Sequence, residues 1–113
     1  MPHVEIKYSE NLDLDTKNIF NTLEQVINKN DSSAGVCKSR AYPCSKYKHS
    51  HILVTISLLT KPHRNDVFTQ KLSKEIEESI KKYFNQSLYF SLNIEYSQSY
   101  YTTNIHLVDG DEL

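Results

Sequence analysis

Pro2 is the first residue whose position indicates chemistry. It follows Met1 directly, so removal of Met1 leaves the proline ring nitrogen as a free secondary amine. An α-amino group ordinarily titrates at about pH 8, and burial or neighbouring cations lower that pKa. The amine would then accept and return a proton near neutral pH. Many chains begin with Met-Pro without using it, so Pro2 alone is a weak indication of a catalytic base.

Three cations accompany this proline. Lys38 and Arg40 stand two residues apart in a strand-like run and so share one face of that strand, and Arg64 lies in the turn after the next apolar strand. Arginine binds a carboxylate through two parallel N–H groups and lysine supplies a point charge, so together they suit a substrate with several carboxylates. On spacing alone, the competing interpretation of three solvated surface charges is the better supported one.

Other chemistry has less support in the sequence. Cys37 and Cys44 are seven residues apart with no second pair to complete a zinc site, and we expect reduced thiols. His49 and His51 share a face if their strand begins early, but no third ligand follows at a suitable spacing. We therefore expect no metal site.

Four strands are predicted from hydrophobic alternation. Residues 3–8 and 88–96 alternate between apolar and polar side chains. Residues 36–42 form a shorter run that Pro43 ends, and residues 52–59 are apolar on both faces, which is typical of a central or interfacial strand. A short terminal strand is expected within 100–108.

Two helices separate these strands. Asp15 can cap the first, whose apolar residues between 19 and 27 fall on one face. Asn65 or Asp66 can cap a second helix, in which an apolar residue recurs at every fourth position from Phe68 to Phe84. The order β-α-β-β-α-β predicts an α/β fold, a two-layer sandwich (α+β) with both helices on one face of a mixed sheet, in a single domain spanning 1–113.

Composition indicates assembly and excludes several partners. Without the eight Tyr, and counting the two Gly, apolar residues make up about a third of the chain, against roughly 45–50% in typical globular domains. A second copy is therefore expected to cover the free sheet face. The net charge of −1 argues against a nucleic acid partner. No apolar run is long enough for a signal peptide or a membrane span, so a cytoplasmic protein is expected.

Five blocks of the sequence together resemble the 5-carboxymethyl-2-hydroxymuconate isomerase family of the tautomerase superfamily, nearly end to end. They are Met1-Pro2-His3, Tyr8-Ser9-Glu10-Asn11-Leu12, Lys38-Ser39-Arg40, Arg64 and Asn104-Ile105-His106. The resemblance implies a cofactor-independent isomerase of aromatic-compound catabolism that acts on a small carboxylated substrate and assembles as a homotrimer.

The resemblance also implies residue roles. Pro2 would be the catalytic acid and base in enol-to-keto conversion, and Lys38, Arg40 and Arg64 would bind the substrate carboxylates. The family has arginine where this chain has Lys38, which lacks the bidentate fork, so a different preferred substrate is one possible consequence. Tyr101 and its neighbour Tyr100 either line the pocket or pack between subunits.

Two other functions remain open at this stage. A non-catalytic ligand-binding or assembly module of the same fold explains the element order equally well. A tautomerase-superfamily enzyme with another substrate would use the same proline in a different reaction.

Overall fold

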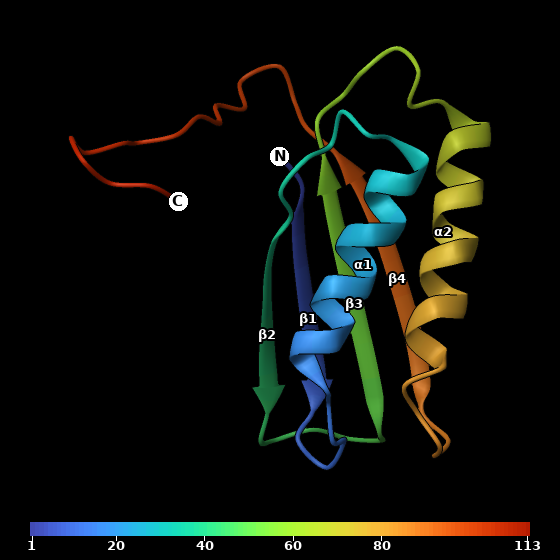
Figure 1. Cartoon of the computed structure of the whole chain (residues 1–113). Coiled ribbons are helices and arrows are strands. Elements are labelled where there is room, and N and C mark those ends of the chain that lie inside the picture. The colour runs from blue at the N-terminus through green and yellow to red at the C-terminus, as the bar shows by residue number, and fades with distance from the viewer.

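Both helices pack on one face of a four-stranded sheet, so the chain forms two layers (Figure 1). The structure is a computed structural model that describes all 113 residues. Its elements, in chain order, are β1 (His3–Ser9), α1 (Thr16–Asn30), β2 (Lys38–Cys44), β3 (His51–Leu58), α2 (Asp66–Lys81) and β4 (Tyr89–Tyr96). This order and the position of the helices confirm the predicted two-layer β-α-β-β-α-β fold.

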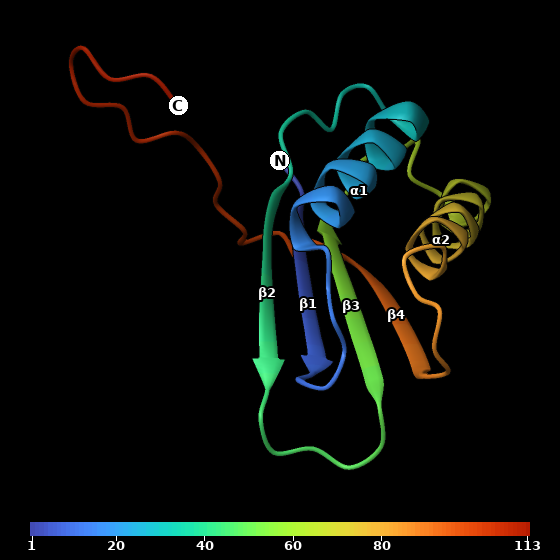
Figure 2. The same cartoon turned by 60° about the horizontal axis from the view of Figure 1, so that its bottom comes forward.

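The sheet has the strand order β2-β1-β3-β4. β1 pairs with β2 in parallel, β3 pairs with β4 in parallel, and the two central strands β1 and β3 are antiparallel. Each half is thus a parallel strand pair joined by a helix, and Figure 2 shows the two helices side by side over the same face. A parallel pair requires such a crossover connection.

The core lies between the helices and this covered face of the sheet. It is aliphatic and fully buried where β1 and β3 face the helices, except at the half-buried Tyr8, and along one side of each helix. Its largest side chains with under 2% exposure include Ile6, Ile19, Leu23, Ile27, Ile52, Ile56, Leu72, Ile76 and Ile80. Burying each contributes roughly 1.5–3 kcal/mol, which orients both helices on the sheet.

Side-chain caps start both helices where the sequence predicts. Asp15 accepts a hydrogen bond from the backbone N–H of Asn18 at 3.5 Å, and Asn65 accepts one from Phe68 at 3.0 Å. Each cap satisfies one backbone donor that the first helical turn leaves unpaired. The second helix ends at Lys81, so Phe84 packs on the core from beyond the helix.

Pro43 does not end β2, contrary to the prediction. The strand begins at Lys38 rather than at residue 36 and continues to Cys44, with Pro43 in register with Tyr8. β2 is an edge strand, and an edge strand accommodates proline because one side of its backbone has no partner strand.

Two further predictions need correction. β3 is central, as expected, but it is apolar on only one face, because Thr55 and Ser57 follow Leu53 on the other. Residues 100–108 form no strand: the chain leaves the sheet after β4 and runs away from it in both views (Figures 1 and 2).

The sheet face opposite the helices has no covering layer, and we call it the open face. Alternation along each strand places mainly polar side chains there. They are His3, Glu5 and Lys7 on β1, Lys38, Arg40 and Tyr42 on β2, Leu53, Thr55 and Ser57 on β3, and Tyr89, Ser91, Asn93 and Glu95 on β4. Neither helix has the length and apolarity needed to cross a membrane.

Candidate functional site

Pro2 lies at the sheet end where β1 and β2 begin and where β3 and β4 finish. The backbone N–H of Lys38 donates to the carbonyl of Pro2 at 2.9 Å, which extends the β1–β2 ladder by one residue. The proline is under 2% exposed. The sheet therefore holds the proline, and with it the nitrogen that Met1 removal would free, in a fixed position.

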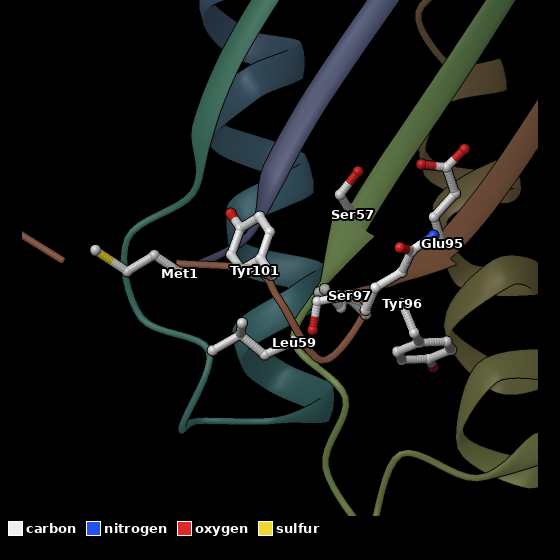
Figure 3. Close-up of a pocket in the computed structure, with 9 residues that line it drawn as sticks. Met1, Ser57, Leu59, Glu95, Tyr96, Ser97 and Tyr101 are labelled. Atoms are coloured by element: carbon white, nitrogen blue, oxygen red, sulfur yellow. The ribbon is translucent and has the colours of Figure 1, made fainter. Parts of the chain in front are cut away.

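A pocket of about 220 Å³ opens beside this end of β1. Its walls come from the N-terminus, the ends of β3 and β4, and the first residues of the C-terminal segment (Figure 3). The lining residues are Met1, Ser57, Leu58, Leu59, Glu95, Tyr96, Ser97, Gln98 and Tyr101. Met1 covers Pro2 here, so its removal would both free the nitrogen and enlarge the pocket.

Hydrogen bonds fix the start of the C-terminal segment against the pocket. Ser97 donates its backbone N–H to Leu58 at 2.8 Å, and Thr60 bonds both the hydroxyl and the carbonyl of Ser97, at 3.0 and 2.7 Å. A turn closed from Tyr101 to Gln98 at 3.1 Å then brings Tyr101 to the pocket. Tyr100 is 94% exposed, so only the second tyrosine lines the pocket.

Positive charge surrounds the N-terminal amine. Burial lowers the pKa of the Met1 amine, and Lys38, Lys61 and Arg64, in that order, lower it further. Each of these effects disfavours the protonated form. An amine at this end of the sheet therefore has a lower pKa than the same amine in water.

Arg40 lies beside Lys38 on the open face and is held by two β1 side chains. Its Nε donates to Glu5 at 3.2 Å, and its Nη1 lies 3.1 Å from Nδ1 of His3. Burial, Lys38 and Arg40 lower the pKa of His3. Because a guanidinium only donates, His3 Nδ1 must accept this bond, which leaves the imidazole proton on Nε2.

Arg64 lies near the amine, but its guanidinium points into the protein. Its side chain is only 2% exposed, with Nε and Nη2 each 2.8 Å from one carboxylate oxygen of Asp31. Its Nη1 donates to the carbonyl of Leu59 at 2.7 Å. In the single chain Arg64 joins the loop after α1 to the loop before α2.

Asp31 is the centre of this connection. Burial alone would raise its pKa, but hydrogen bonds from Ser33, His63 and Arg64 outweigh burial and hold the pKa well below its usual range. The carboxylate is therefore ionised at neutral pH, and it neutralises the buried guanidinium.

The structure thus brings three of the four predicted site residues together. Pro2, Lys38 and Arg40 share the start of β1 and β2, whereas the guanidinium of Arg64 is bound to Asp31. Sequence reasoning missed Lys61, whose Nζ donates to Ser33 at 3.0 Å and which also acts on the amine. Its position two residues after an apolar strand was a signal as good as that of Arg64.

No three side chains among His, Cys, Asp and Glu come together in a group that could hold a metal ion. Both cysteines are free, and burial, with a smaller effect of Glu24, raises the pKa of Cys37 to about 11. The Cys37 thiol is thus protonated at neutral pH.

No family model matches the chain, and no curated protein does either. Three similar solved structures are informative. A 5-carboxymethyl-2-hydroxymuconate isomerase from Deinococcus radiodurans R1 is 18% identical with a TM-score of 0.72, over 92% of this chain and 90% of that one. A macrophage migration inhibitory factor-like protein from Entamoeba histolytica is 12% identical with a TM-score of 0.68, over 93% and 96%.

The third is a fused 4-OT symmetric trimer, 10% identical with a TM-score of 0.66, over 96% of this chain and 93% of that one. All three alignments run almost end to end. They show that the chain has the same subunit fold as these three proteins.

Proposed function

From the premise that this chain has the tautomerase subunit fold, we propose that it is a cofactor-independent tautomerase. Its substrate would be a carboxylated dienol of the 2-hydroxymuconate type, such as 5-carboxymethyl-2-hydroxymuconate, which it would convert to the keto isomer. The observation that carries the proposal is the burial of Pro2 beside a pocket, among cations that lower the pKa of the terminal amine.

The reaction needs a base that is neutral before the proton transfer and an acid after it. The Pro2 nitrogen accepts the proton of the enol hydroxyl, the C–O bond becomes a carbonyl, and the double bonds shift along the chain. The protonated amine then returns the proton to a distal carbon, which completes the isomerisation without net loss of atoms or charge. A retained Met1 prevents this step because an amide nitrogen has no basic lone pair.

The cations have two roles in this mechanism. Lys38 and Arg40 bind a substrate carboxylate on the open face, and their charge stabilises the enolate as it develops. Lys38 also keeps the amine neutral. Direct binding of a carboxylate by Arg64 stays a prediction, and it requires the guanidinium to leave Asp31.

Assembly is part of the proposal. The open face carries Leu53 and Tyr42 among polar residues and has no cover in the single chain. A homotrimer, the state named for the fused 4-OT structure, would place that face between subunits. Symmetric closure is the usual way in which one chain buries such a face.

The test is ultraviolet-monitored ketonisation of 2-hydroxymuconate and 5-carboxymethyl-2-hydroxymuconate, with loss of Met1 verified by intact mass. We expect turnover by the processed protein and at least about a tenfold lower kcat/KM for Pro2→Ala. Pro43→Ala on the edge strand is the matched control and should leave kcat/KM unchanged.

Each negative result has a distinct meaning. Turnover unaffected by Pro2→Ala would remove the proline from the mechanism. No turnover of either compound by the processed protein would favour a non-catalytic binding module or a tautomerase-superfamily enzyme with another substrate.

A further inference from the structure

The end of the sheet at Pro2 has opposite charges on its two sides. Lys38, His3, Ser57 and Glu95 stand in register on β2, β1, β3 and β4. Neighbouring strands are about 4.8 Å apart, so this row spans roughly 14 Å from the lysine backbone to the glutamate backbone. Pro2 precedes His3 and therefore lies between the cations on one side and a carboxylate on the other.

Glu95 is the single charged side chain that lines the pocket. Figure 3 shows it projecting from β4 next to the β3 strand end that carries Ser57. Its Oε1 accepts a hydrogen bond from Asn93 at 2.9 Å, but it belongs to none of the five ion pairs in the structure. The exposed carboxylate of Glu95 therefore lies at the pocket without a side-chain cation paired to it.

The remaining polar groups of the pocket are uncharged. Ser57, Ser97, Gln98 and Tyr101 offer hydroxyl and amide groups on the same wall as Glu95. These groups can bond a neutral hydroxyl or carbonyl, or lie beside an apolar substituent. None of them supplies the positive charge that would stabilise a carboxylate against Glu95.

We propose that Glu95 determines substrate specificity by excluding a second carboxylate from the β4 side of the pocket. The preferred substrate is an enol acid whose single carboxylate faces Lys38 and Arg40 and whose other end, toward Glu95, is uncharged. This inference rests on the proposed function and changes the expected preference within it: among carboxylated dienols, a monocarboxylate is favoured over 2-hydroxymuconate and its carboxymethyl derivative, which carry further carboxylates. Its physical cause is like-charge repulsion in a pocket of about 220 Å³.

A pair of inert ligands tests the inference without requiring turnover. Sorbate and trans,trans-muconate share a six-carbon diene acid and differ in a methyl group or a second carboxylate at the far end. We expect calorimetry of the processed protein to show tighter binding of sorbate. Glu95→Gln should improve muconate binding relative to sorbate roughly tenfold, because it removes the charge and keeps the shape.

Glu78→Gln is the matched control. Glu78 is exposed on α2, on the opposite side of the sheet from the open face, and its substitution changes the net charge by the same amount. The ratio of the two affinities should stay at its wild-type value. A long-range effect of net charge would move the ratio equally in both variants and overturn the inference.

The kinetic counterpart compares 2-hydroxymuconate with 2-hydroxy-2,4-hexadienoate. The ratio of their kcat/KM values should favour the monocarboxylate in the wild type and shift toward the dicarboxylate by about tenfold in Glu95→Gln. Turnover of both compounds with an unchanged ratio in Glu95→Gln would overturn the specificity role and leave the proposed function standing. Charge-dependent binding of sorbate and muconate without any turnover would overturn the proposed function and support the ligand preference. Binding of neither ligand would overturn the specificity role.

Discussion

At the scale of single residues, the reactivity proposed for Pro2 would be a property of its surroundings. The proline nitrogen is an ordinary amine in the unfolded chain. Burial at the start of β1, together with Lys38, Lys61 and Arg64, lowers the pKa of the Met1 amine against a smaller opposing effect of Cys37. In the proposed mechanism the same surroundings would act on the Pro2 amine once Met1 is removed, so that this base would be neutral at a pH where a free amine is mainly protonated.

Lys38→Met tests this electrostatic role. Removing the lysine raises the pKa of the Pro2 amine, so the rising limb of the pH profile of kcat/KM moves to higher pH. The wild-type limb should lie below the ordinary value of about 8 for an α-amino group. Lys74→Met, on the exposed side of α2, is the control and should leave the limb in place. An unmoved limb in Lys38→Met would show that Lys38 does not lower the pKa of the proposed base.

Arg64 and Asp31 form the buried ion pair of the molecule, with side chains 2% and 6% exposed. Arg64→Ala leaves the Asp31 carboxylate without its main partner and is expected to lower the free energy of unfolding by about 3 kcal/mol. Arg40→Ala breaks a pair whose side chains are 40% and 35% exposed and should cost less than about 1 kcal/mol. Urea denaturation of both variants measures the difference, and equal losses would contradict the structural role of Arg64.

The lowered pKa of Asp31 also predicts how stability depends on pH. The folded state holds this carboxylate ionised below the ordinary pKa of 3.8, so its contribution is complete above that pH and is lost as the pH falls further. Asp31→Asn should be less stable than the wild type at pH 7 and should lose less stability on acidification from pH 5 to pH 3. Parallel stability curves for the two proteins would contradict this assignment.

At the scale of elements, the C-terminal segment divides into a fixed and a projecting part. Ser97 is bonded to Leu58 and Thr60, and Tyr101 reaches the pocket. Beyond it the chain leaves the sheet, with Ile105, Leu107 and Val108 between 55% and 61% exposed. These apolar residues add nothing to the core of the single chain.

Truncation after Thr102 tests this division. Loss of residues 103–113 should leave the circular dichroism spectrum of the fold unchanged. In the monomeric protein, the free energy of unfolding should change by less than about 0.5 kcal/mol, because residues 104–113 are exposed and make no core contact. Truncation after Ser97 also removes Tyr101 and should weaken substrate binding, seen as a higher KM. If the protein truncated after Thr102 were unfolded, the projecting part would be shown to support the fold.

At the scale of the whole molecule, one sheet face is covered by helices and the other by nothing. The covered face is aliphatic, while the open face mixes charges with Leu53, which is 38% exposed at the middle of a central strand. A face of this kind, too polar for a core and flat enough for a neighbour, fits a subunit interface.

Light scattering after size exclusion should therefore give a mass three times that of the chain. Leu53→Lys places a charge at the centre of the open face and should shift the protein toward monomers. Val67→Lys, at a helix position that is 76% exposed, is the control and should keep the assembly. A monomeric wild type would exclude the trimer.

The elements of this fold were predictable because their causes are local. Apolar residues at helical or alternating spacing specify which side of each element is buried, and Asp15 and Asn65 mark the helix starts by bonding backbone donors three residues on. The errors arose where the outcome depends on a neighbour: Pro43 is tolerated because β2 is an edge, and residues 100–108 find no partner strand in the single chain.

By itself, the sequence determined the order of elements, the single aliphatic core and the proximity of Pro2 to a strand start. Only the tertiary structure decided which charges meet. Strand register placed Lys38 and Glu95 at opposite ends of one row. The approach of two loops brought Arg64 into contact with Asp31, which is 33 residues away in sequence. Such contacts depend on how distant segments pack, and residue spacing along the chain carries no record of that packing.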